Sequence, residues 1–79
     1  MNTRPLSTIA GEIIQAWKPM YFGAVPYARA MLSLDTIQDQ YGYDSAKSIV
    51  LYFLSNATGW RGDTARRIKL ELKTMAGVK

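Results

Sequence analysis

Apolar residues recur along most of the chain at intervals of three and four, the spacing that places side chains on one face of an α-helix. Four segments show this pattern, and their expected bounds are residues 7–18, 26–41, 44–57 and 63–75. No stretch alternates apolar and polar residues between turns, so we expect no strands. The pattern therefore predicts an all-α fold, a small single-domain bundle of about four helices.

Helix-breaking and helix-capping residues delimit these segments. Pro19 ends the first, and Pro26 suits the first turn of the second because a missing N–H costs nothing there. Gly42 and Gly59 are expected to end the second and third helices. The side chains expected to cap helix starts are those of Ser7 or Thr8, Asp44 and Asp63.

The third segment is apolar on nearly all sides. Ile49 and Phe53 share one face with other apolar residues, yet Leu51 and Tyr52 lie on the opposite side. A helix that is apolar nearly all round is usually buried in the middle of its fold. We therefore expect the other three helices to pack around this one.

Composition then limits the chemistry. The 79 residues include no cysteine and no histidine, which removes thiolate chemistry, the commonest transition-metal ligand and the usual general base. No phosphate-binding Walker loop, serine nucleophile motif or acid–base pair is recognisable. We expect a protein that is not an enzyme and that uses neither a cofactor nor a metal.

The sequence pattern also indicates neither a membrane-spanning segment nor a secretion signal. The longest apolar run, residues 49–54, is far shorter than the roughly 20 residues that cross a bilayer. The first residues contain no apolar segment of the kind found in signal peptides. We expect a cytoplasmic protein with no membrane partner.

The positive charge is concentrated in the C-terminal half. The formal net charge is +4, and residues 1–39 contribute none of it. Arg66, Lys69 and Lys73 stand at i, i+3 and i+7, so they form a stripe beside the apolar face of the fourth predicted helix, and Arg67 flanks it. This stripe is either a solvated face or a surface for a negatively charged partner.

A turn with two glycines, residues 59–62, precedes that helix. Free N–H groups and the helix dipole attract phosphate at such a helix start. The turn resembles a helix-hairpin-helix element, with Arg61 in place of the second hairpin glycine and Gly62 one position late. In the alternative interpretation it is an ordinary turn between helices, and Trp60 plugs the edge of the core.

The aromatic residues Tyr21 and Phe22 lie in the loop before the second predicted helix. One interpretation is that they fold back over the core. The other is that they are exposed anchors for a protein partner or for self-association, because tyrosine and tryptophan dominate binding hot spots. The sequence leaves both interpretations open.

Three stretches together resemble a group of short proteins encoded by tailed bacteriophages and prophages. They are Tyr21–Tyr27 (YFGAVPY), Tyr52–Ala57 (YFLSNA) and Trp60–Lys69 (WRGDTARRIK). The resemblance covers about residues 6–72 and implies no site residues. It implies a phage accessory protein that works in the cytoplasm of the bacterial host.

Small non-catalytic phage proteins usually act by occupying a surface of something else. We therefore expect a binding protein that inhibits or redirects a host system, such as a CRISPR or nucleotide-signalling defence. Its partner would be a host protein or nucleoprotein complex, or an anionic ligand such as a nucleic acid or nucleotide. The candidate contact residues are Trp60, Arg61, Gly62, Arg66, Arg67, Lys69, Lys73, Tyr21 and Phe22.

Two alternatives remain. The first is a nucleic-acid-binding protein that contacts the phosphate backbone through the turn at residues 59–62. The second is a structural or assembly protein of the virion, which would form a homo-oligomer through its aromatic loop. Nucleic-acid binding would weaken steeply with salt, whereas binding through aromatic residues would depend on salt much less.

Overall fold

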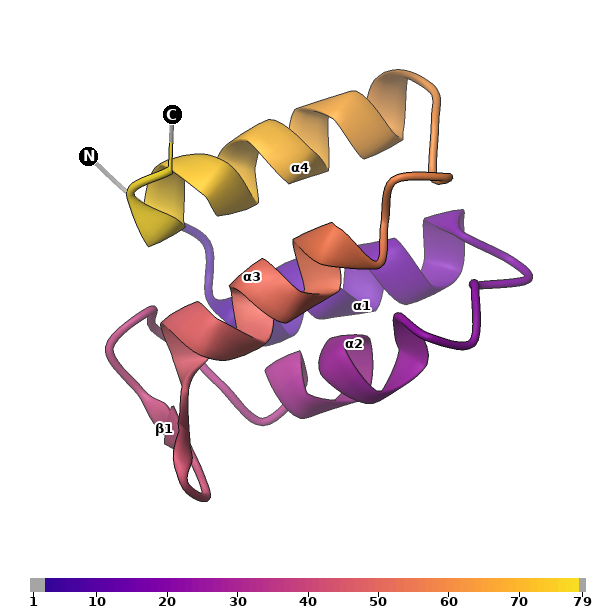
Figure 1. Cartoon of the computed structure of the whole chain (residues 1–79). Coiled ribbons are helices and arrows are strands. Elements are labelled where there is room, and N and C mark those ends of the chain that lie inside the picture. The colour runs from indigo at the N-terminus through magenta and orange to yellow at the C-terminus, as the bar shows by residue number, and fades with distance from the viewer. Residues whose placement is uncertain (1–2, 79) are drawn as a thin grey trace.

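The computed structural model describes residues 3–78. Within that range the helices are α1 (Leu6–Ala16), α2 (Val25–Met31), α3 (Ala46–Ser55) and α4 (Asp63–Ala76), and a short hairpin of β1 (Gln40–Tyr41) and β2 (Asp44–Ser45) precedes α3. Both α1 and α3 pack against α2 and against α4, so the four helices surround a shared interior (Figure 1). The chain is a small all-α domain, as the apolar spacing predicts.

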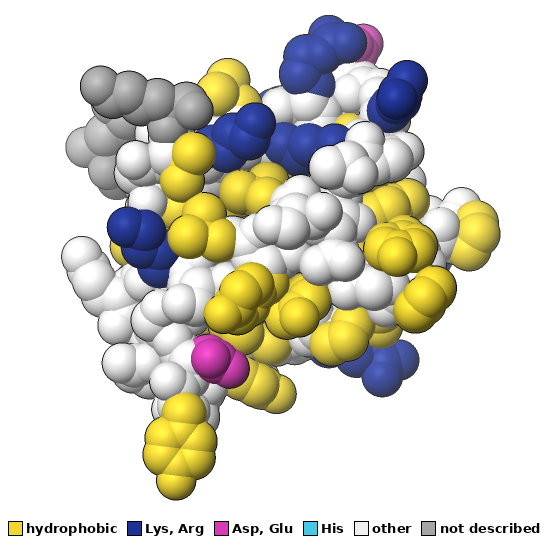
Figure 2. All heavy atoms as spheres, in the orientation of Figure 1, with side chains coloured by type: hydrophobic (Ala, Val, Ile, Leu, Met, Phe, Trp, Pro, Cys, Tyr) yellow, Lys and Arg dark blue, Asp and Glu magenta, His cyan; other side chains and the backbone are white. Residues whose placement is uncertain are grey.

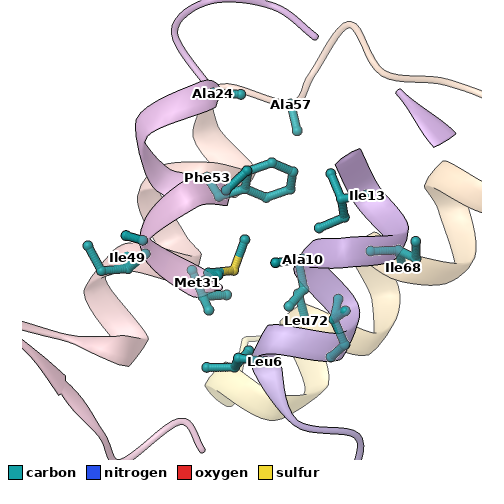
Figure 3. Packing of buried hydrophobic residues seen from close by; sticks show 14 of the residues in the cluster. Leu6, Ala10, Ile13, Ala24, Met31, Ile49, Phe53, Ala57, Ile68 and Leu72 are labelled. Atoms are coloured by element: carbon teal, nitrogen blue, oxygen red, sulfur yellow. The ribbon is translucent and has the colours of Figure 1, made fainter. Parts of the chain in front are cut away.

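The interior is apolar throughout the described residues. The ring of Phe53 on α3 points toward Ile13 on α1, and both side chains are fully buried (Figure 3). Ile68 and Leu72 cover the interior from α4, and Met31 does so from α2. Burying a large apolar side chain contributes about 1.5–3 kcal/mol. The fold therefore rests on one cluster to which all four helices contribute.

The third helix packs against α2 and α4, as α1 does, so α3 takes one side of the shared interior and does not stand at its centre with the other three helices around it. Ile49, Val50 and Phe53 form its buried face, as the sequence predicts. Its outer face is only partly covered, since Leu51 is half-buried and the Tyr52 side chain is 48% exposed. Tyr52 instead packs its ring against that of Tyr27 on α2, with the centroids 5.5 Å apart.

The second helix is shorter than predicted, because it ends at Met31 and not near residue 41. The Asp39 carboxylate accepts hydrogen bonds from the backbone N–H groups of Asp35 at 2.8 Å and Thr36 at 3.1 Å, and another from the Thr36 hydroxyl. These bonds lower the pKa of Asp39. Short polar side chains compete with a helix for backbone donors in this way, so the segment turns instead of continuing α2.

The hairpin corrects the expectation that the chain has no strands. Its strands pair in antiparallel register, Gln40 with Ser45 and Tyr41 with Asp44. Gly42 adopts φ 62° in the two-residue turn, a conformation that glycine reaches easily. Strands of two residues are too short to show an alternating pattern, which is why the sequence did not indicate them.

The observed helix caps also differ from the predicted ones. Ser45 caps α3, and its hydroxyl accepts the Ser48 N–H at 3.1 Å, so the cap is not Asp44. At α1 the N–H groups of residues 6 and 7 donate to backbone carbonyls of residues 35 and 34, so neither Ser7 nor Thr8 caps that helix. Asp63 begins α4 but makes no capping hydrogen bond. Its charge still suits the positive end of the helix dipole.

No helix in the described part of the chain is both long enough and apolar enough to cross a membrane.

Candidate anion-binding site

A groove of about 440 Å³ lies between the turn at residues 60–62 and the outer flank of α4. We call it the basic groove. Four of its seven lining residues are positively charged, and none is acidic. Figure 2 shows Lys and Arg side chains gathered over α4. The lining residues are Trp60, Arg61, Gly62, Arg66, Lys69, Leu70 and Lys73.

The helical repeat of α4 produces this stripe of charge. Ile68 and Leu72 point into the core and are fully buried. Residues 66, 69, 70 and 73 lie on the flank beside this buried face, within about one quadrant of the helix surface. Leu70 is 65% exposed and adds an apolar patch among the cations. The structure confirms the predicted stripe of Arg66, Lys69 and Lys73.

Trp60 is a core residue, with only 5% of its surface exposed. Its ring stacks on that of Trp17 with the centroids 5.2 Å apart, and the edge of Phe53 lies 6.4 Å away. The interpretation that Trp60 plugs the edge of the core is therefore correct. It borders the basic groove only with the small part that remains exposed.

Lys69 links the turn to α4. Its Nζ donates to the Trp60 carbonyl oxygen at 2.5 Å. Partial burial lowers the pKa of Lys69, and the positive charges of Lys73 and Arg61 lower it further. The cations of the basic groove thus repel one another, and a bound anion would relieve that repulsion.

Within the part of the chain that the structure describes, three of the four cations in the basic groove lack an acidic partner. Within residues 3–78, no carboxylate lies within ion-pair distance of Arg61, Lys69 or Lys73. Arg66 pairs with Asp63 at 3.5 Å, but these side chains are 81% and 100% exposed. An ion pair that is this exposed contributes little, so it leaves Arg66 largely available to a ligand.

Arg67 belongs to a different part of the surface. It forms an ion pair with Glu12 on α1, and Arg4 pairs with the same carboxylate at 2.9 Å and with Glu71 at 2.7 Å. One residue further along a helix is about 100° further round its axis, which carries Arg67 away from the stripe. Its charge is neutralised within the fold, so Arg67 does not line the basic groove.

Tyr21 and Phe22 also lie outside the basic groove. Their side chains are 50% and 80% exposed, and the two rings are 4.9 Å apart. They do not fold back over the core as a pair. Tyr21 lines a separate concavity, and Phe22 lines neither that concavity nor the basic groove.

A second concavity, of about 480 Å³, borders the same turn. No residue that lines it is acidic, Lys or Arg, and we call it the neutral pocket. Its lining comes from two segments that are far apart in the chain, residues 17–21 and 55–59, so no local pattern in the sequence could reveal it. The residues are Trp17, Pro19, Tyr21, Ser55, Asn56, Thr58 and Gly59.

No protein-family model, curated protein or solved structure matches this chain. What bears on its function is therefore the geometry and charge of these two concavities.

Proposed function

We propose that this chain is a non-catalytic binding protein that holds a negatively charged partner in the basic groove. The observation that carries the proposal is unbalanced charge. Arg61, Lys69 and Lys73 line one concavity, and no carboxylate of residues 3–78 lies within ion-pair distance of them. Such a cluster attracts anions and speeds their encounter with the surface.

The composition of the site supports binding over catalysis. Its charged groups are amines and guanidinium groups, which donate hydrogen bonds and hold charge. Without histidine or cysteine, the chain has no side chain whose ordinary pKa suits acid–base or nucleophilic work near neutral pH.

The resemblance to phage proteins supplies the setting for this proposal. In that setting the chain is an accessory protein of a tailed phage or prophage, and it acts in the cytoplasm of the bacterial host. By seating an acidic host protein, a nucleoprotein complex, a nucleic acid or a nucleotide in the basic groove, it inhibits or redirects a host defence. The groove is open to solvent, so a large partner can contact it as well as a small one.

A second candidate function is an assembly role in the virion, and one observation favours it. Phe22 is 80% exposed, and Tyr43, at the tip of the hairpin, is fully exposed. Exposed aromatic side chains on so small a protein are typical of an interface. A concentration-dependent oligomer that dissociates in Phe22→Ala or Tyr43→Ala would support this function, and a monomer at all concentrations would exclude it.

Charge reversal tests the leading proposal. Arg61→Glu with Lys73→Glu should weaken binding of a fluorescent oligonucleotide or of poly-glutamate by tenfold or more, because each substitution turns attraction into repulsion. The matched control is Arg29→Glu with Lys47→Glu, which makes the same change of charge at exposed positions outside the basic groove. Circular dichroism should show the same helix content in both variants.

Two results would overturn the proposal. One is equal loss of binding in both double variants, which would mean that net charge alone attracts the probes. The other is that the unaltered protein binds neither probe at low salt. If nucleic acid is the ligand, three neutralised phosphates predict a slope of log affinity against log salt of about −2 to −3.

A further inference from the structure

The basic groove and the neutral pocket are neighbours that share one turn. Thr58 and Gly59 line the pocket, and the next three residues of the chain line the groove. Trp17 forms part of the pocket wall and Trp60 part of the groove wall, and these two rings stack with centroids 5.2 Å apart. The cationic concavity and the uncharged one therefore adjoin at the turn of residues 58–62 and at the Trp17–Trp60 stack.

The neutral pocket has the chemistry that suits an aromatic, uncharged, polar ligand. The side chains of Trp17 and Tyr21 give it flat apolar surface, and those of Ser55, Asn56 and Thr58 give it hydroxyl and amide groups. Its volume falls within the roughly 300–1,000 Å³ of small-molecule sites. Unpaired nucleobases are recognised in this way, by stacking on aromatic rings and by hydrogen bonds to their edges.

The Asn56 side chain, which lines the neutral pocket, is held in one orientation. Its amide nitrogen donates to the Tyr52 carbonyl at 2.9 Å, which fixes the orientation of the amide group. Its Oδ1 remains an acceptor that receives no hydrogen bond from residues 3–78. Gly23 permits this arrangement, because a Cβ there would lie 2.8 Å from Asn56 Oδ1 and 2.6 Å from the ring of Tyr21.

We propose that the two concavities form one composite site for a nucleotide, with the phosphate in the basic groove beside Arg61 and Lys73 and the base in the neutral pocket. This inference rests on the proposed function and names its ligand class. The nucleotide is either free or a unit of a single strand, since the recognised chemistry is the same. A paired base is not available to such a pocket, so duplexes bind less tightly than single strands of the same charge.

An abasic strand provides a sharp test, because it keeps the phosphates and lacks the bases. We expect a base-bearing strand of about eight nucleotides to bind about tenfold more tightly than the abasic strand of equal length, as stacking of one base predicts. Adenosine monophosphate, compared with adenosine and with ribose 5-phosphate, tests whether a free nucleotide suffices. Equal affinity for base-bearing and abasic strands, without preference for the monophosphate over ribose 5-phosphate, would overturn the composite site.

Substitutions then separate the two halves of the site. Tyr21→Ala with Thr58→Val should weaken binding of the base-bearing strand by about tenfold and leave the abasic strand unchanged. Tyr41→Ala is the matched control, because it removes an exposed tyrosine that lines neither concavity. Arg61→Glu with Lys73→Glu should weaken binding of both strands.

The variants also distinguish failure of the composite site from failure of the proposed function. If the groove variant loses both strands while the pocket variant binds like the unaltered protein, the composite site is wrong and the proposed function stands. If the groove variant binds both strands normally, the proposed function is itself wrong. The two tryptophans give an independent readout, because a base in the pocket should change the fluorescence of Trp17, and ribose 5-phosphate should not.

Discussion

The indole rings of Trp17 and Trp60 stack with their centroids 5.2 Å apart and their planes within 6° of parallel. Both rings meet the ring of Phe53 edge-on, at 6.2 Å and 6.4 Å. The three aromatic residues join the end of α1, the buried face of α3 and the turn before α4. They therefore fix the position of the turn that carries Arg61 to the basic groove.

Replacing Trp60 should unfold the protein rather than merely weaken binding. Trp60→Ala removes a buried aromatic side chain and one half of the stack, which predicts a loss of about 3–5 kcal/mol in the free energy of unfolding. That is a large share of the stability of a domain this small. Urea unfolding followed by circular dichroism measures it, with Trp60→Phe as a milder control. A stable Trp60→Ala protein that had lost binding would show instead that Trp60 is a surface contact.

The two glycines of the turn should respond differently to the same substitution. Gly62 has φ 113°, which L side chains rarely adopt, so Gly62→Ala should cost about 1–3 kcal/mol through backbone strain alone. Gly59 does not have a positive φ, and a Cβ there meets no atom within 4 Å. Gly59→Ala should therefore be neutral or slightly stabilising. Equal thermal unfolding midpoints for the two variants would contradict this account of the turn.

The fold could be predicted wherever local pattern decides it. The apolar spacing located both ends of α1, α3 and α4 to within two residues, because their buried faces repeat at the helical period. The end of α2 could not be found in this way. It depends on hydrogen bonds that the Asp39 carboxylate makes to the backbone, and on the carbonyls of Leu34 and Asp35 that receive the first N–H groups of α1.

The candidate site could likewise be predicted only in part. The stripe of Arg66, Lys69 and Lys73 follows from their spacing on one helix, so the sequence is sufficient to predict it. Which cations are neutralised is a matter of tertiary contacts, since Glu12 lies 55 positions before Arg67. The burial of Trp60 likewise depends on a ring from the far end of α1. Distant contacts of this kind leave no signature in a single sequence.

Lys69 should contribute to the stability of the fold, whereas its neighbour Lys73 should not. Lys69→Met keeps an apolar stem of similar length but removes the donor to the Trp60 carbonyl, and we expect a loss of about 1 kcal/mol. Lys73 lines the same groove, and no hydrogen bond joins its Nζ to residues 3–78. Lys73→Met is therefore the matched control, expected to leave the midpoint of urea unfolding unchanged. Equal midpoints in the two variants would show that the Lys69 bond does not hold the turn.

Four charged side chains tie the N-terminal segment to α1 and α4. Glu12 accepts from Arg67 and pairs with Arg4, and Arg4 also donates from two nitrogens to Glu71. The hydrogen bond from Arg67 and then the one from Arg4 hold the pKa of Glu12 below its ordinary value of 4.5. Because the folded state binds the Glu12 proton less readily than the unfolded chain, this carboxylate stabilises the fold above that ordinary value.

Glu12→Gln should therefore remove stability at neutral pH and leave the variant less sensitive to acid. At neutral pH we expect a loss of about 1 kcal/mol, because these partly exposed ion pairs are individually weak. As the pH falls below 4.5 and through the lowered pKa, Glu12 of the unaltered protein takes up its proton, and the difference between the two proteins should disappear. Urea unfolding across that range measures the difference, with Asp44→Asn as a control for removing a carboxylate outside the network. A constant difference at every pH would show that the ion pairs do not stabilise the fold through the charge of Glu12.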